Sequence, residues 1–123
     1  MTTSCTRRSR SNVAVQALGL LNDPTFVEAA QAMGARLIEE VPSDEERIER
    51  LFLLCLGRAP DEQEQQMVSE LHARQQKIFQ GDETMALAAV GEYLSAGADP
   101  ARQAAWIAVS RTIMNLDEFI TRE

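Results

Sequence analysis

A chain of 123 residues, 45% of them hydrophobic, is long enough to bury a core, so we expect one folded domain. The formal net charge of −7 argues against a general nucleic-acid binder, because binding to phosphates requires a basic surface. No stretch approaches the roughly 18 consecutive apolar residues of a transmembrane helix, so we predict no membrane span.

The first residues of the chain are polar and show no hydrophobic periodicity. We interpret residues 1–11 as a flexible N-terminal arm, a severed linker in front of the folded domain. Arg7, Arg8 and Arg10 give this arm a local positive charge. Together with Asn12 they form the one candidate interaction surface that the sequence offers, either for an anion or nucleic acid or for upstream protein structure. A solvated arm is the other interpretation.

A first helix is predicted over about residues 12–21, and a second follows it directly. Asp23 is a good N-cap, and Pro24 suits the first helical position, where its missing N–H costs nothing. Gly34 permits the close approach of another helix, and Pro42 ends this one. The buried face of the second helix is predicted to consist of Phe26, Ala30, Met33, Leu37 and Val41.

The central element is predicted to be a helical hairpin over about residues 43–79. Ser43, with Glu46 three residues later, predicts a capping box at the start of its first helix. Gly57 suits the left-handed residue that ends a helix, and Pro60 prevents continuation. The short connection makes the two helices antiparallel neighbours or a sharply angled pair.

The first helix of this hairpin is apolar on one face and then on nearly all sides. One apolar face is formed by Ile48, Leu51, Phe52 and Cys55. In the second half of the helix, Leu53, Leu54 and Leu56 widen this face until the helix is apolar on nearly all sides. Because a helix that is apolar all round is normally buried on every side, we place it at the centre of the core. Asp61 with Glu64 predicts a second capping box, which starts the next helix. That helix carries a narrower stripe of Met67, Val68, Leu71, Ile78 and Phe79.

Two further helices are predicted in the last third of the chain. Asp82 caps a helix over about residues 83–94, and an Asp-Pro pair begins a helix over about residues 99–115. The last helix is predicted to be buried, since residues 104–109 are six apolar residues in succession. The inward face of the shorter helix is predicted to be Met85, Ala88, Ala89, Tyr93 and Leu94. A final turn that folds back onto the core is predicted at Leu116, Phe119 and Ile120.

These elements predict an all-α fold, because no segment alternates with the period of a strand. We expect a compact bundle of five to six helices that forms a single helical domain over residues 12–123. The hairpin at about 43–79 contributes one central helix, and the buried C-terminal helix at about 99–115 contributes the other.

The sequence contains no residue that we assign to catalysis, to a cofactor or to a metal ion. His72 is the only histidine, and no cysteine or second histidine stands at metal-site spacing, so we interpret it as a surface or boundary residue. Trp106 is interpreted as a core anchor, the alternative being a ring that stacks on a sugar or a base. Haem-attachment, P-loop and dinucleotide-binding motifs are absent from the sequence.

Three stretches of the chain together resemble one protein family. They are R-R-S-R-S-N-V-A-V-Q-A-L-G-L-L-N-D-P-T-F-V-E-A-A at 7–30, L-G-R-A-P-D-E-Q-E at 56–64, and A-A-W-I-A-V-S-R-T-I-M-N-L-D-E-F-I-T-R-E at 104–123. They resemble the C-terminal end of large planctomycete proteins with the PSD1 (DUF1553) domain. The resemblance implies the C-terminal fragment of a multidomain, exported protein, in which this domain commonly follows a DUF1549 domain and often a cytochrome-c-like haem domain. It implies no catalytic residues, because the family has no established activity.

Three hypotheses for function follow. The first is a non-catalytic docking or structural module that packs on upstream domains of its parent, or on a second copy, through apolar and arginine-rich surface. The alternative is part of an enzyme for carbohydrate breakdown or haem-linked redox chemistry, in which Arg7, Arg10 and Asn12 contribute to a site completed by missing upstream domains. A third hypothesis is nucleic-acid binding through the basic arm.

Overall fold

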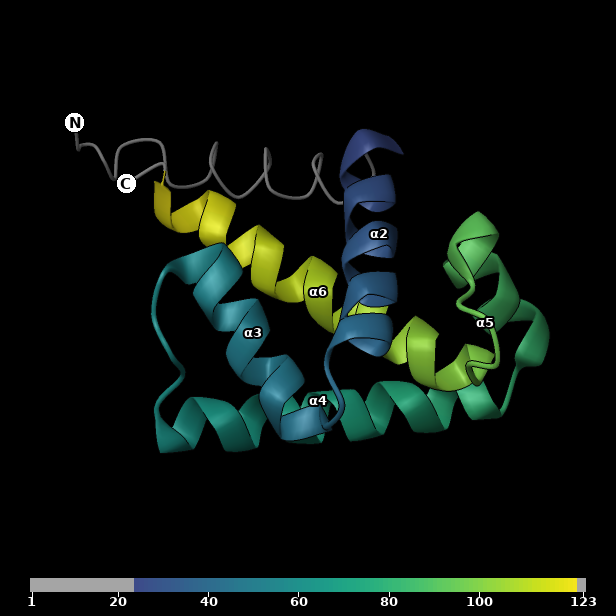
Figure 1. The fold of residues 1–123 in the computed structure, drawn as a ribbon, viewed down its shortest axis with the longest axis horizontal. Coiled ribbons are helices and arrows are strands. Elements are labelled where there is room, and N and C mark those ends of the chain that lie inside the picture. Colours follow the sequence, from purple (N-terminus) through teal and green to yellow (C-terminus); the bar gives the residue numbers. More distant parts are fainter. Residues whose placement is uncertain (1–23, 122–123) are drawn as a thin grey trace.

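The computed structural model describes the backbone of residues 24–121 and the side chains of residues 24–116. Over these residues the chain forms five α-helices and one short 3-10 helix, with no strands, so the all-α prediction is confirmed (Figure 1). The predicted arm at 1–11 and the predicted helix at 12–21 lie outside the described residues. The elements are α2 (Pro24–Glu40), α3 (Asp44–Leu56), α4 (Glu62–Gln80), α5 (Glu83–Val90), η1 (Gly91–Tyr93) and α6 (Pro100–Thr121).

The last helix, α6, is the centre of the bundle and packs against α2, α3, α4 and α5 (Figure 1). Trp106 and Val109 on this helix are fully buried, so its predicted central position is confirmed. The predicted end near Asn115 and the separate final turn are wrong, because α6 continues to Thr121. No glycine or proline follows Asn115 to end the helix. None of the described helices combines the length and apolar character needed to cross a bilayer.

The predicted central position of α3 is wrong. This helix buries only one face, formed by Ile48, Leu51 and Phe52, against α4 and α6. The opposite side is open to solvent, and there Leu53 is 54% exposed and Leu54 is 49% exposed. An apolar side chain can remain on the surface when no other element covers it, so continuous apolar sequence alone does not place a helix in the centre.

The core consists of two hydrophobic clusters that share α6. The first lies between α2, α3, α4 and α6, and the second lies between α2, α4, α5 and α6. The first contains Leu37, Val41, Ile48, Leu51, Phe52, Val68, Trp106, Val109 and Ile113, with Cys55 and Leu71 packed at its edge. The second contains Ala30, Phe79, Ala86, Val90, Ala101, Ala104, Ala105 and Ile107. Five members of the inward faces predicted for the second helix of the hairpin and for the helix at about 83–94 are instead exposed, namely Met67, Ile78, Met85, Ala88 and Leu94.

Where α2 crosses α6, Gly34 allows the two backbones to approach closely. A Cβ atom on Gly34 would lie 2.5 Å from Cγ1 and 3.3 Å from the backbone nitrogen of Ile107. The expectation that Gly34 permits close helix packing is therefore confirmed. This contact sets how near α2 lies to the central helix, and through it the position of the loop that leads into α3.

The turn between α3 and α4 is fixed by local hydrogen bonds. Gly57 adopts a φ of 74° and donates its N–H to the Leu53 carbonyl at 3.2 Å. At the start of α4, Asp61 Oδ1 accepts the Glu64 N–H at 2.7 Å, and Glu64 Oε1 accepts the Asp61 N–H at 3.0 Å, which completes the predicted capping box. Two bonds from Arg58, both 2.7 Å, lower the pKa of the Glu64 carboxyl to about 2. At α3 only half of the predicted box forms, since Ser43 Oγ accepts the Glu46 N–H at 3.3 Å.

The two caps differ enough to be told apart by substitution. We expect Asp61→Ala to lower the free energy of unfolding by about 1 to 2 kcal/mol, because it removes the short 2.7 Å bond from the Glu64 N–H to Asp61 Oδ1 in a complete box. Ser43→Ala should cost about 0.5 kcal/mol, since it removes a single long bond. Urea unfolding followed by circular dichroism measures both values, and equal losses would contradict this ranking.

Candidate functional site

The residues with unusual environments meet where α3, α4 and α6 come together. His72 on α4 is buried and stacks on Trp106 of α6, with ring centroids 4.2 Å apart and an interplanar angle of 28°. The interpretation of His72 as a surface or boundary residue is therefore wrong. The interpretation of Trp106 as a core anchor is confirmed, because its side chain is completely buried.

Three charged side chains lie close to this stack. Arg47 on α3 is itself buried, with a side-chain exposure of 7%, and donates through Nη1 to Asp44 Oδ1 at 2.6 Å. Its Nε donates to the Leu37 carbonyl at the end of α2, at 3.0 Å. Arg102 on α6 reaches the same Asp44 carboxylate at 3.3 Å. One carboxylate and two guanidinium groups thus link α2, α3 and α6 beside the His72 ring.

This environment changes two pKa values. Burial lowers the pKa of His72 below its ordinary value of 6.5, and the positive charges of Arg102 and Arg47 act in the same direction, while Asp44 opposes them. For Asp44, partial burial alone would raise the pKa. The hydrogen bonds from Arg47 and Arg102 outweigh that effect and hold the pKa of the Asp44 carboxyl below its ordinary value. At neutral pH His72 is therefore neutral, and Asp44 is ionised.

Several buried polar atoms of this region have no hydrogen-bond partner within the part of the chain that the structure describes. They are His72 Nε2, Trp106 Nε1, Ser110 Oγ and Asn115 Oδ1. Such atoms are uncommon in folded proteins, and each carries a desolvation cost. Among the described residues no base accepts a hydrogen bond from the Ser110 hydroxyl, so nothing there activates it as a nucleophile.

Another buried polar side chain, Gln103, does have hydrogen-bond partners and has a structural role. Gln103 at the start of α6 accepts the Ser95 N–H at 3.0 Å and donates to the Tyr93 carbonyl at 2.7 Å. Its amide therefore fixes the connection from η1 to α6. Ser95 in turn donates its hydroxyl to Glu39 of α2 at 2.8 Å.

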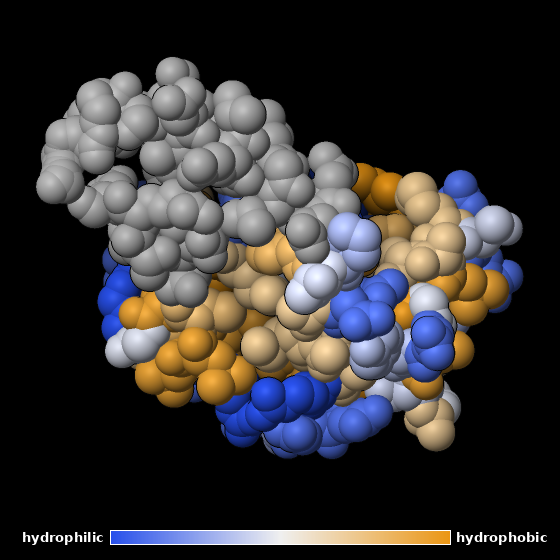
Figure 2. Space-filling view, turned by 90° about the horizontal axis from the view of Figure 1, so that it is seen from above, coloured by the Kyte–Doolittle hydropathy of each residue, from blue (hydrophilic) through white to orange (hydrophobic). Residues whose placement is uncertain are grey.

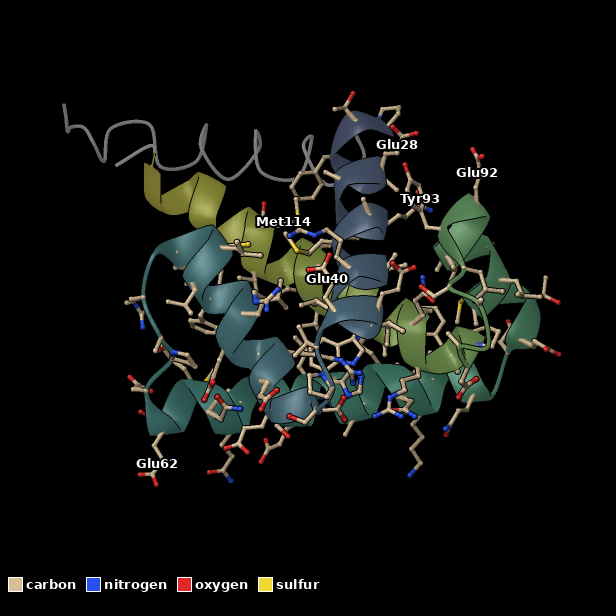
Figure 3. All side chains as sticks on the ribbon, viewed as in Figure 1. Glu28, Glu40, Glu62, Glu92, Tyr93 and Met114 are labelled. Atoms are coloured by element: carbon tan, nitrogen blue, oxygen red, sulfur yellow. The ribbon has the colours of Figure 1, made fainter. Side chains whose placement is uncertain are left out.

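An acidic groove lies between α3 and α4, with a volume of about 540 Å³. Its lining includes Asp44, Glu45, Glu62 and Glu70, with Ile48 among them. Figure 3 shows the Glu62 side chain at the start of α4 directed away from the protein. Within residues 24–116 no group of three or more His, Cys, Asp and Glu side chains is placed to hold a metal ion.

Exposed apolar side chains lie at more than one place on the protein, and one set of them is at the end formed by α3 and the second half of α6. Leu53 and Leu54 of α3 contribute to it, and Leu116 on α6 is 43% exposed. Figure 2 shows hydrophobic surface in the left half of the view, where these two segments lie in Figure 1. Leu87 on α5, at the opposite end of the bundle (Figure 1), is exposed to a similar degree, as are Met85 and Leu94 near it in the sequence.

Comparison with known families agrees with the resemblance seen in the sequence. The model of PSD1, described as a protein of unknown function (DUF1553), matches residues 1–72. The chain belongs to the PSD1 family. No curated protein and no solved structure matches it.

The PSD1 match ends within α4, so it includes some residues of the buried centre and not others. Asp44, Arg47 and His72 lie inside the matched range, whereas Arg102 and Trp106 on α6 lie beyond it. The segment that matches PSD1 therefore supplies one ring of the stack and two of the three charged side chains, and the remainder of the chain supplies the other ring and Arg102.

The interaction surface predicted from the basic residues of the N-terminal arm is not among the described residues. Arg7, Arg8, Arg10 and Asn12 all fall outside them, and that prediction stays a prediction. Sequence reasoning missed the burial of His72 and of Arg47. For His72 a signal existed, because it stands four residues after Val68 and seven before Phe79, on the same helical stripe.

Proposed function

We propose that this PSD1-family chain is a non-catalytic docking module that packs on preceding domains of a larger, exported parent protein. The observation that supports this proposal is the uncovered apolar side of α3, where two adjacent leucines are about half exposed. Large apolar side chains grouped on one end of a small helical bundle are characteristic of protein interaction surfaces.

The energetics favour an extended contact rather than a contact with α3 alone. Completing the burial of Leu53 and Leu54 would contribute about 1 kcal/mol each, since each is already half buried. A stable interface buries about 1,200–2,000 Å² in total, so the docking surface must also include neighbouring residues. Leu116 on α6 extends the apolar surface at the same end of the bundle.

Calorimetric titration of this chain with the separately expressed remainder of its parent tests the proposal. We expect micromolar or tighter binding, and we expect the double substitution Leu53→Glu and Leu54→Glu to weaken it at least tenfold. The thermal stability of the variant should change little, because both side chains are exposed in the bundle.

Leu87→Glu is the matched control, because it places the same charge on a leucine of similar exposure on α5. The control should bind as the native chain does. Failure of the native chain to bind, or equal binding by the α3 variant, would refute docking through α3. Sedimentation velocity distinguishes the remaining outcome, because a dimer dispersed by the α3 variant would assign this surface to a second copy instead.

A further inference from the structure

The only histidine and the only tryptophan of the chain are stacked on each other in the core. His72 is 5% exposed, and its Nε2 has no hydrogen-bond partner within the described residues. A neutral imidazole tolerates this position, because one ring nitrogen can remain without a proton. An imidazolium would bring a buried charge and a second N–H donor to the same place, which burial strongly disfavours.

The charged groups around His72 add to this effect. The charges of Arg47 and Asp44 on α3, and of Arg102 on α6, shift the pKa of the ring. From α2, the Leu37 carbonyl joins this network, because it accepts a hydrogen bond from Arg47 Nε. Two guanidinium groups thus face the ring with a single carboxylate between them. Protonation of His72 would add a third positive charge to a network with only that one carboxylate.

We propose that His72 is an acid-sensitive latch that holds α3 against α4 and α6. While the ring is neutral, it stacks on Trp106, and Arg47 remains buried beside it. When the ring is protonated, repulsion from Arg47 is relieved most easily by movement of α3. This helix packs through one face only, and its other side is exposed. The latch does not depend on the docking proposal, because it needs no partner.

The sign of the pH dependence follows from the lowered pKa of the folded state. In the unfolded chain His72 takes up a proton near pH 6.5, whereas in the folded chain it does so only at lower pH. The contribution of His72 to the free energy of unfolding is therefore fully present above pH 6.5, and it falls as the pH drops below 6.5. Between the two pKa values each pH unit shifts the folding equilibrium by up to tenfold. Asp44 stays ionised over most of this range, since its own pKa lies below its ordinary value.

A pH titration of the full chain by NMR and by tryptophan fluorescence tests the latch. Because the chain has one histidine and one tryptophan, the imidazole Cε1–H signal and the emission signal each report a single residue. We expect the histidine midpoint below pH 6.5, with a change in Trp106 emission at the same midpoint. A midpoint at or above 6.5, or an emission that is constant through the titration, would overturn the proposal.

Two substitutions at partly exposed positions should move the midpoint in opposite directions. Arg102→Gln removes a positive charge and should raise the midpoint, whereas Asp44→Asn removes the opposing negative charge and should lower it. Arg74→Gln is the matched control, an exposed arginine on α4 that should leave the midpoint unchanged. Unshifted midpoints in both Arg102→Gln and Asp44→Asn would refute the electrostatic network.

Hydrogen exchange tests whether α3 is the element released. Below the midpoint, amides of α3 should exchange at least tenfold faster than at pH 7 after correction for intrinsic rates, while those of α5 change less. Equal acceleration in α3 and α5 would show global loosening and would exclude a latch on α3. In His72→Phe, which keeps an aromatic ring and cannot take up a proton, this selective acceleration should disappear. If that variant does not fold, the Arg102 and Asp44 variants still decide the question.

Discussion

Replacing Trp106 with alanine is expected to lower the free energy of unfolding by about 3 to 5 kcal/mol. The indole is completely buried in the cluster shared by α2, α3, α4 and α6, and it forms one half of the His72 stack. Its removal leaves a large cavity and a buried histidine with no ring to cover it. Since small domains are stable by only about 5 to 15 kcal/mol, this single change should remove much of the stability.

Trp106→Phe separates the loss of packing from the loss of the indole N–H. This variant keeps an aromatic ring against His72 and removes a buried donor, Nε1, that has no partner among the described residues. Loss of an unsatisfied donor offsets part of the packing cost, so we expect a penalty of about 1 to 2 kcal/mol. Chemical unfolding followed by circular dichroism measures both variants. A phenylalanine variant as unstable as the alanine variant would show that the stack on His72 contributes little.

Gly34→Ala is expected to destabilise the protein even though alanine is the better helix former. Helix propensity alone would stabilise the variant by about 1 kcal/mol. The new methyl group would lie 2.5 Å from Cγ1 of Ile107, and the backbone of Ile107 lies close behind it. Because α2 and α6 must separate to admit the methyl group, overpacking costs up to about 3 kcal/mol. We therefore expect a net loss of about 2 kcal/mol.

A double-mutant cycle with Ile107→Ala tests this cause. Ile107→Ala removes the Cγ1 atom that the new methyl group would strike, so Gly34→Ala should be neutral or stabilising in that background. Thermal unfolding of the four proteins gives the coupling energy between the two positions, which we expect to be about 1 to 3 kcal/mol. If the effects of the two substitutions were additive, the clash with Ile107 would not be the cause of the destabilisation by Gly34→Ala.

The hairpin could be predicted from sequence because its ends depend on local chemistry. Asp61, Glu64 and Gly57 interact with residues only a few positions away, so their pattern already contains the interactions that they form. The close approach of two helices at Gly34 could also be predicted, because it depends on a property of the residue itself, namely that glycine has no side chain.

The errors arise where burial depends on distant parts of the chain. Leu53 and Leu54 are as apolar as Leu51, and nothing in the sequence of α3 reveals that only one side is covered. In α5 nearly every residue is apolar, so the buried pair Ala86 and Val90 could not be distinguished from its neighbours.

The candidate site was missed because a charged or titratable residue is normally expected at the surface. Arg47 is buried because the Leu37 carbonyl and the Asp44 carboxylate satisfy its guanidinium, and one of these groups is ten residues away. His72 is buried because its ring faces Trp106, which is 34 positions further along the chain. Such pairs become visible only when α4 and α6 are placed beside each other.

The central position of α6 has a consequence for how the protein folds during synthesis. The ribosome makes α2, α3, α4 and α5 first, and all four pack against a helix that follows them in the chain. Until α6 emerges, the faces that it covers are exposed to solvent, and their apolar residues are available for incorrect contacts. We therefore expect the bundle to form only after α6 has left the exit tunnel, in one late step that depends on contacts between distant residues.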